Sequence, residues 1–309
     1  MDMRTWVAGA IMLPLLTSMI FISTTVNDLS TMDPHDSASA THAEQLAVFV
    51  DQSVAELATA DPVFADWLTA TYDIHPLGPG TSAWLVLIAQ NDQPLGYLIV
   101  GSDHNESFKL VEYGVGAFPL FSTNTLHREL MRSGLISSSK DSSAPIDLAM
   151  LRNELDRVEL IYNDPFEALW EVEQSGITYW FDGITAQPLA LDENPASLSR
   201  WQQALNVAPK TMTSAQQVER QAPFDPYEHF NWLVSEPLAM EQTHLKMFLA
   251  EHKRLVFLTS ILNDIKAPYA VTGYQHWGQE TLFVQIEHDG ERFIPWVLLQ
   301  QIGDFYPDM

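Results

Sequence analysis

The sequence predicts an α+β protein in which an N-terminal transmembrane helix is followed by two small units, each an antiparallel sheet packed with helices. Three observations support this fold class: an uncharged apolar segment close to the N-terminus, groups of hydrophobic runs of strand length, and a Ser-rich junction between two such groups. Hydrophobic residues make up 46% of the 309 residues, while 14 Gly and 18 Pro are too few for a low-complexity chain, so most of the chain should fold.

The apolar segment runs from Trp6 to Ile22 and has the length of a membrane-spanning helix. Its 17 residues would span roughly 26 Å as an α-helix, close to the thickness of the hydrocarbon core of a bilayer. Arg4 precedes it, whereas residues 24 to 108 contain twelve acidic residues and no Lys or Arg. Because positively charged flanks stay in the cytoplasm, we expect a single-pass protein of the cell membrane with a cytoplasmic N-terminus and an exported body. Residues 1–23 are the predicted anchor, and 24–40 a polar tether.

Removal of this segment as a signal peptide is the alternative, and the protein would then be secreted. The Ala38-Ser39-Ala40 pattern is a cleavage signature, but it lies much further beyond the apolar run than signal-peptide geometry requires. An uncleaved signal-anchor is therefore the favoured prediction.

The first predicted unit, residues 41–136, begins with helices and continues as an antiparallel meander. Thr41 and Glu44 have the spacing of a capping box, and Asp61 with Pro62 is typical of a helix start. Hydrophobic spacing predicts helices at 41–57, 61–72 and 124–133, and strands at 83–89, 96–100 and 108–115.

A polar stretch, Ser137 to Pro145, is the predicted linker to the second unit, residues 146–309. Asp289-Gly290 between two hydrophobic runs is a strong hairpin signal near the C-terminus. Residues 193–226 should form a surface excursion. Strand pairing between the two units, giving one continuous core, is the alternative architecture. The predicted helices of this unit are 146–157, 199–205 and 237–255, and its predicted strands are 158–162, 168–173, 177–181, 269–276, 281–288 and 291–298.

Two stretches resemble known extracytoplasmic domains. Gly96-Tyr-Leu-Ile-Val-Gly-Ser-Asp103, followed by Lys109-Leu-Val-Glu-Tyr-Gly114, resembles the strand pair of streptopain-type propeptides and related inhibitors. Leu169-Trp-Glu-Val-Glu173 with Ile177-Thr-Tyr-Trp-Phe-Asp-Gly-Ile-Thr-Ala-Gln-Pro-Leu189 resembles PepSY-type domains, and Ala186 stands where the family pattern Asp-x-x-Thr-Gly has its glycine. The resemblance implies small PepSY-like or cystatin-like units that lie outside the cytoplasm and act on secreted peptidases without catalysing a reaction.

Composition and motifs exclude several kinds of function. A formal charge of −25, from 40 acidic and 15 basic residues, opposes binding to nucleic acid. The sequence has no cysteine, and therefore no disulfide, thiolate metal site or cysteine nucleophile. It has no nucleotide-binding, zinc-peptidase or serine-hydrolase motif, and we predict neither a cofactor nor a metal. The acidic balance fits an acid-living source or simply an acidic surface.

Four carboxylates are the candidates for catalysis if the protein is a hydrolase of an acidic habitat: Asp103, Glu171, Glu173 and Asp182. Glu171 and Glu173 lie two apart on a predicted strand and should share a face, either as a pair with one raised pKa or as part of a hydrated surface. Asp182, with Thr185, is expected to accept backbone N–H bonds in a turn. Convergence of two of the four carboxylates in one pocket would favour the hydrolase.

The remaining candidates have simpler structural interpretations. Ser102 to Glu106, which includes His104, is expected to be a turn, because adjacent residues rarely aim at one point. Glu241 and His244 are spaced for one helix face, but a metal site of that kind needs further ligands, and His252 is too far along the helix. For the aromatic residues, core packing is the default, and an exposed row that grips a partner is the alternative. Those considered are Trp84, Trp170, Tyr179, Trp180, Trp277 and Trp296.

The favoured function is a membrane-anchored, extracytoplasmic, non-catalytic binding or regulatory module, for which we predict no catalytic, cofactor-binding or metal-binding residues. Its expected partner is an extracytoplasmic protein or peptide, such as a secreted peptidase, bound by an edge strand or an aromatic face. The carboxylate-dependent hydrolase is the alternative.

Overall fold

A computed structural model describes residues 37–308, apart from 79, 138–145, 192–194, 196, 211–214, 263–264 and 279–280. Within these residues the protein is a mixed α+β structure whose sheets are antiparallel, which confirms the predicted class at that level. None of the helices in the described part is long and apolar enough to cross a membrane. The predicted anchor, 1–23, and most of the tether lie outside the described residues.

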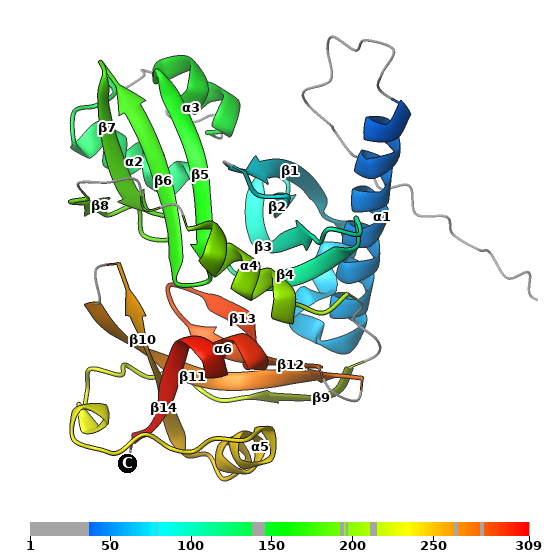
Figure 1. Cartoon of the computed structure of the whole chain (residues 1–309), viewed down its shortest axis with the longest axis vertical. Helices are drawn as coiled ribbons and strands as arrows, with labels where there is room; N and C mark the ends of the chain where they lie inside the picture. The colour runs from blue at the N-terminus through cyan, green and yellow to red at the C-terminus, as the bar shows by residue number, and fades with distance from the viewer. Residues whose placement is uncertain are drawn as a thin grey trace, which may run out of the picture.

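The larger of the two sheets has ten strands, from β1, the first strand of the chain, to β14 at the C-terminal end (Figure 1). Its strand order is β1-β2-β3-β4-β13-β12-β11-β10-β14, and β9 pairs with β11 beside this path. Neighbouring strands are antiparallel throughout. The strands are β1 (Thr71–Leu77), β2 (Ala83–Gln90), β3 (Gln93–Ser102), β4 (Phe108–Val115), β9 (Ala215–Arg220), β10 (Arg254–Ile261), β11 (Ile265–Trp277), β12 (Thr281–Glu287), β13 (Glu291–Pro295) and β14 (Gly303–Asp308).

The smaller sheet has four strands in sequence order: β5 (Arg157–Asp164), β6 (Glu167–Gln174), β7 (Ile177–Asp182) and β8 (Pro188–Leu189). Ser175 and Gly176 form the tight turn between β6 and β7, and both have the positive φ that such a hairpin turn requires. This turn and the three longer strands were predicted correctly.

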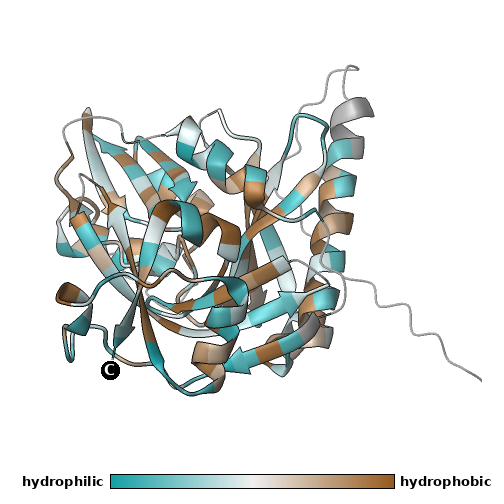
Figure 2. Cartoon of the chain, turned by 60° about the horizontal axis from the view of Figure 1, so that its bottom comes forward, coloured by the Kyte–Doolittle hydropathy of each residue, from teal (hydrophilic) through white to brown (hydrophobic). Residues whose placement is uncertain are grey.

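Helices cover the sheets, and α1 (Ser37–Ala60) is the longest of those described. Figure 2 shows hydrophobic and hydrophilic residues alternating along α1, as in a helix that lies on a sheet with one face. It begins inside the predicted tether, so the expected capping box at Thr41 does not mark its start. The other helices are η1 (Pro62–Thr69), α2 (Thr123–Arg132), α3 (Leu148–Glu154), α4 (Leu198–Val207), η2 (Asn231–Leu233), α5 (Gln242–Ala250) and α6 (Trp296–Ile302).

Three predicted elements differ from the structure. The helix expected at 61–72 is a 3₁₀ helix capped by Asp61, as predicted, but it ends at Thr69 and is followed by β1. The helix expected at 237–255 is the shorter α5, followed by β10. The strand expected at 291–298 ends at Pro295, and its apolar continuation is α6, because a short apolar run fits a buried helix as well as a strand.

Each face of the larger sheet packs against its own core. On one face, α1 and η1 cover side chains such as Val86, Leu98 and Phe283. On the other face, Leu85, Ile99 and their neighbours pack with the small sheet, α4 and α6 in one large cluster. The alternation of the two sets along each strand is the two-residue periodicity of a sheet that is buried on both sides.

The larger sheet joins strands from both predicted units. β4 belongs to the unit predicted at 41–136 and β13 to the unit predicted at 146–309, and they pair with Phe293 opposite Tyr113. The inner core also contains residues from both. The expectation of a separate sheet in each unit is therefore corrected: without β13, the edge of β4 would have unpaired backbone groups. The predicted linker, except Ser137, lies outside the described residues.

Candidate functional site

The small sheet has an open edge beside β7. The terminal strand β8 pairs only with Trp180 and Phe181 of β7. Within the described part of the chain, the first half of β7, from Ile177 to Tyr179, has a strand partner only on its β6 side. An edge of this kind presents backbone N–H and C=O groups that can pair with another strand.

A mainly apolar groove of about 420 Å³ lies along this edge. One wall is formed by Thr178–Phe181 of β7, and another by Pro188–Leu191. Ser133 and Leu135, just after α2, close the third side. The groove therefore lies beside backbone that can pair with a ligand strand, and it offers apolar space for that strand's side chains.

The turn before β8 holds this edge in place, and Asp182 is its central residue. The Asp182 carboxylate accepts hydrogen bonds from the backbone N–H of Ile184 (3.0 Å), the backbone N–H of Thr185 (2.7 Å) and the Thr185 hydroxyl (2.8 Å). This geometry confirms the predicted turn. Ala186 has a φ of +55°, a left-handed conformation that favours glycine.

Glu171 and Glu173 share one face of β6, as predicted, and both contact Arg157 on β5. Arg157 forms an ion pair with Glu171, and its Nε lies 3.4 Å from Glu173 Oε2. Glu159 stands opposite Glu171 in the ladder, and Glu173 stands opposite Thr178 of β7. This arrangement is a charged network with an excess of acid next to the open edge.

Asp103 lies in the turn between β3 and β4, on a different part of the molecule. Its Oδ1 accepts from the N–H groups of Asn105 and Ser107, and Lys210 Nζ lies 3.0 Å from its Oδ2. The hydrogen bond from Lys210 is the main cause that lowers the pKa of Asp103. Asp103 also lines a polar cleft with His104, but as a stable anion in a turn it is a poor proton donor.

Of the four candidate carboxylates, the structure brings together only Glu171 and Glu173. Arg157 neutralises part of their charge, while Asp182 is a turn acceptor and Asp103 is paired with Lys210. The arrangement does not provide the general acid and general base in one pocket that the hydrolase requires.

The histidine pattern and the aromatic residues have structural placements. Glu241 precedes α5, His244 is exposed, and His252 lies beyond the helix. In the described part of the chain, no group of three His, Asp or Glu side chains is placed to hold a metal ion. The aromatic residues singled out are core residues, as expected: Trp170, Trp180, Trp277 and Trp296 are buried, and Trp84 and Tyr179 are partly buried.

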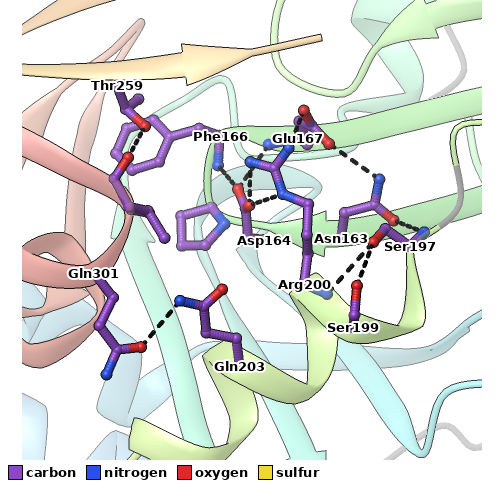
Figure 3. Close-up of polar contacts among 12 residues, drawn as sticks. Asn163, Asp164, Phe166, Glu167, Ser197, Ser199, Arg200, Gln203, Thr259 and Gln301 are labelled. Carbon is purple, nitrogen blue, oxygen red and sulfur yellow. Dashed lines mark hydrogen bonds and ion pairs between the residues drawn. The ribbon is translucent and has the colours of Figure 1, made fainter. Parts of the chain in front are cut away.

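A polar cluster that the sequence analysis did not find fixes α4 against the small sheet (Figure 3). Arg200 on α4 reaches back to Asp164, with 2.7 Å between Nε and Oδ2, and also pairs with Glu167. Asn163 accepts a hydrogen bond from the N–H of Ser197, which caps the same helix. Burial raises the pKa of Glu167. Asn163, Asp164 and Glu167 lie more than 30 residues before Arg200 in the sequence, so only the fold reveals the cluster.

The chain matches no family model, and no curated protein matches it either. The fold and the groove define only a structural class. The protein is an α+β protein in which a small sheet with an open edge packs against a larger sheet.

Proposed function

We propose that this protein is a membrane-anchored, extracytoplasmic, non-catalytic binding module that takes up an extended segment of a partner protein along β7. The observation that carries the proposal is the open edge of the small sheet beside an apolar groove. A strand added to β7 gains affinity from main-chain hydrogen bonds, and its alternate side chains enter the groove and select the sequence.

The acidic side chains next to the open edge of β7 favour a partner segment that carries Lys or Arg. The side chain of Glu173 is 37% exposed, and the smaller Thr178 stands between it and the open edge. A long cationic side chain on the added strand can lie across Thr178 and approach the Glu173 carboxylate. Glu159 and Glu171 add negative charge on the same side, and Arg157 offsets only part of it.

The membrane location and the partner class are further parts of the proposal. The apolar segment Trp6 to Ile22, with Arg4 before it and acidic residues after it, supports an anchor with an exported body. The PepSY-like segment 169–189 corresponds to β6, β7 and β8, and the left-handed Ala186 lies where that pattern has glycine. These features support a secreted peptidase as the partner.

A matched pair of variants tests the groove. Ser133 is an exposed residue of the groove wall, so Ser133→Trp should fill the groove without disturbing the core. Arg132→Trp places the same ring one residue away, outside the groove lining. Peptides would be selected from a displayed random library against the full-length protein in nanodiscs, and their affinities measured for each variant.

We expect the selected peptides to contain apolar residues with Lys or Arg. Ser133→Trp should weaken their binding at least tenfold, and Arg132→Trp should change it less than twofold. Hydrogen exchange should show slower exchange of backbone amides in Ile177–Tyr179 when the peptide is bound. Selection of no peptide, or equal binding by both variants, would show that this edge is not the binding site.

A further inference from the structure

A second surface of the molecule displays large apolar side chains to solvent. Between β9 and α5, Val234 is 87% exposed, Leu233 63%, Tyr227 50% and Phe230 47%. Single exposed apolar residues are ordinary, but four within eight positions concentrate exposed apolar side chains on one segment, and concentrations of this kind mark interaction sites. We call these four residues the apolar loop surface.

The backbone under this surface is held in place by several contacts. Trp232 is buried, and its Nε1 donates a 2.8 Å hydrogen bond to the carbonyl of Pro226. The rings of Tyr227 and Phe230 both contact the Trp232 ring. After η2, the backbone N–H of Leu238 donates a hydrogen bond to the carbonyl of Phe305 on β14. The helix η2 itself also lies against β14. The exposed side chains are thus presented by an anchored segment.

Phe230 adopts an unfavourable backbone conformation at the start of η2. Its φ is +54°, in the left-handed region that aromatic residues rarely occupy. Trp232, two residues later, points into the protein, while nearly half of Phe230 remains in solvent. The left-handed conformation of Phe230 therefore does not place the Phe230 side chain in the core, which leaves its ring available for contact with a partner.

The charges around the apolar loop surface favour a protein partner over an anionic lipid surface. Asp225, Glu228 and Glu236 flank it, and the sequence has no Lys or Arg between Arg220 and Lys246. Arg254 pairs with Glu228 at 3.0 Å and compensates one of the three acids. An acidic rim opposes contact with an anionic lipid surface, and it complements a protein pocket lined by apolar side chains and bordered by Lys or Arg.

We propose that Tyr227, Phe230, Leu233 and Val234 form a docking surface for a folded protein partner with an apolar pocket and a basic rim. This surface is separate from the β7 groove and does not depend on the function proposed for it. Val234 and Leu233 are the inserting side chains, because they are the most exposed of the four. Asp225 and Glu236, the two acids that Arg254 does not compensate, meet the basic rim.

The experiment places a photo-crosslinking amino acid, p-benzoylphenylalanine, at position 234 of the full-length protein in cells of its source organism. A matched control carries it at Val48, which is 54% exposed on α1. We expect a discrete protein crosslinked at position 234 and not at 48, with the crosslink mapped to an apolar pocket bordered by Lys or Arg. Crosslinking to lipid, to a second copy of this chain, or to no defined pocket would overturn the proposal.

Reconstitution with the purified crosslinked partner completes the test. Leu233→Ser combined with Val234→Ser should weaken binding at least tenfold, whereas Val48→Ser should leave it within twofold. Asp225→Asn combined with Glu236→Gln should weaken binding about threefold and reduce its dependence on salt. Ser133→Trp in the β7 groove should have no effect, so that failure of one site is distinguishable from failure of the other. Equal binding by the Leu233 and Val234 double variant would overturn the proposal.

Discussion

Arg292 on β13 and Glu112 on β4 form an ion pair in which both side chains are almost completely buried, with 2.5 Å between Arg292 Nη2 and Glu112 Oε1. Tyr162, on the small sheet, donates a 2.6 Å hydrogen bond to the other oxygen of Glu112. Arg292 also donates to the carbonyl of Pro165, between β5 and β6. The pair therefore connects the two sheets, and its charges are surrounded by hydrogen-bonding partners.

Arg292→Met should destabilise the protein by about 3–5 kcal/mol, because it leaves the Glu112 carboxylate buried without its partner. Urea unfolding measures the free energy of unfolding. Arg132→Met is the control, since Arg132 is 71% exposed in its pair with Glu129, and its loss should have a much smaller effect than the loss of Arg292. Arg292→Met combined with Glu112→Met should be more stable than Arg292→Met alone. If the double variant is no more stable, an unpaired buried charge is not the cause of the loss.

Stability should decrease in mild acid because of His288. Burial of its imidazole, aided by Arg292 with Nη1 3.3 Å from His288 Nδ1, lowers the pKa from 6.5 to about 4, although Asp182 opposes this shift. Between pH 6.5 and 4 the unfolded chain binds a proton that the folded protein does not, so the free energy of unfolding falls as the pH falls. The contribution of His288 to this loss is about 2 kcal/mol from pH 7 to pH 5, and it levels off below pH 4 at about 3 kcal/mol.

His288→Gln isolates this effect, since glutamine does not titrate and retains a hydrogen-bond acceptor. We expect urea unfolding at pH 7 and pH 5 to show a smaller difference for the variant than for the native sequence. Burial also lowers the pKa of His75, which acts in the same direction, so His75→Gln is measured in parallel. An unchanged pH dependence in His288→Gln would contradict the prediction.

Cleavage in the stretch from Ser137 to Pro145 should not separate the protein into two independent domains. The pairing of β4 with β13 and the shared core should hold the two fragments together after limited proteolysis. We expect the nicked protein to elute as one species in size-exclusion chromatography and to unfold in one transition. Two fragments that elute separately, each with its own unfolding transition, would instead support independent domains at 41–136 and 146–309.

A tag after Met309 tests the proposed topology. It should be accessible to protease added outside intact cells, and the protein should remain in the membrane after a carbonate wash. A protected tag would reverse the orientation. A soluble mature chain beginning near Thr41 would show that the N-terminal segment is cleaved.

Local signals in the sequence were sufficient for many elements. Asp61 caps a helix, Asp182 organises a turn, and Asp289-Gly290 joins two strands, because each acts on residues close to it in the chain. By contrast, β1 and β14 were not predicted, since short strands with polar residues and proline gain their structure from pairing with a neighbour. The β7 groove was not predictable because it depends on where β8 ends and on Leu135 from a distant segment.

The buried ion pair between Arg292 and Glu112 could not be predicted from the sequence for a different reason. Glu112 is a charged residue within an apolar strand, which signals that it needs a partner. Nothing near it in the chain identifies Arg292 as that partner, because the two residues meet only when β4 pairs with β13.

The pairing of β4 with β13 also orders the steps of biosynthesis. Val115 on β4 lies opposite Glu291, so the larger sheet is incomplete until the chain has been made at least as far as β13. At about 5–20 residues per second, β4 waits roughly 10 to 35 s for its neighbour, with its hydrogen-bonding edge uncovered. A chaperone that shields this edge during synthesis would therefore protect the nascent chain from aggregation, and a chain that stops before residue 291 would be a target for degradation.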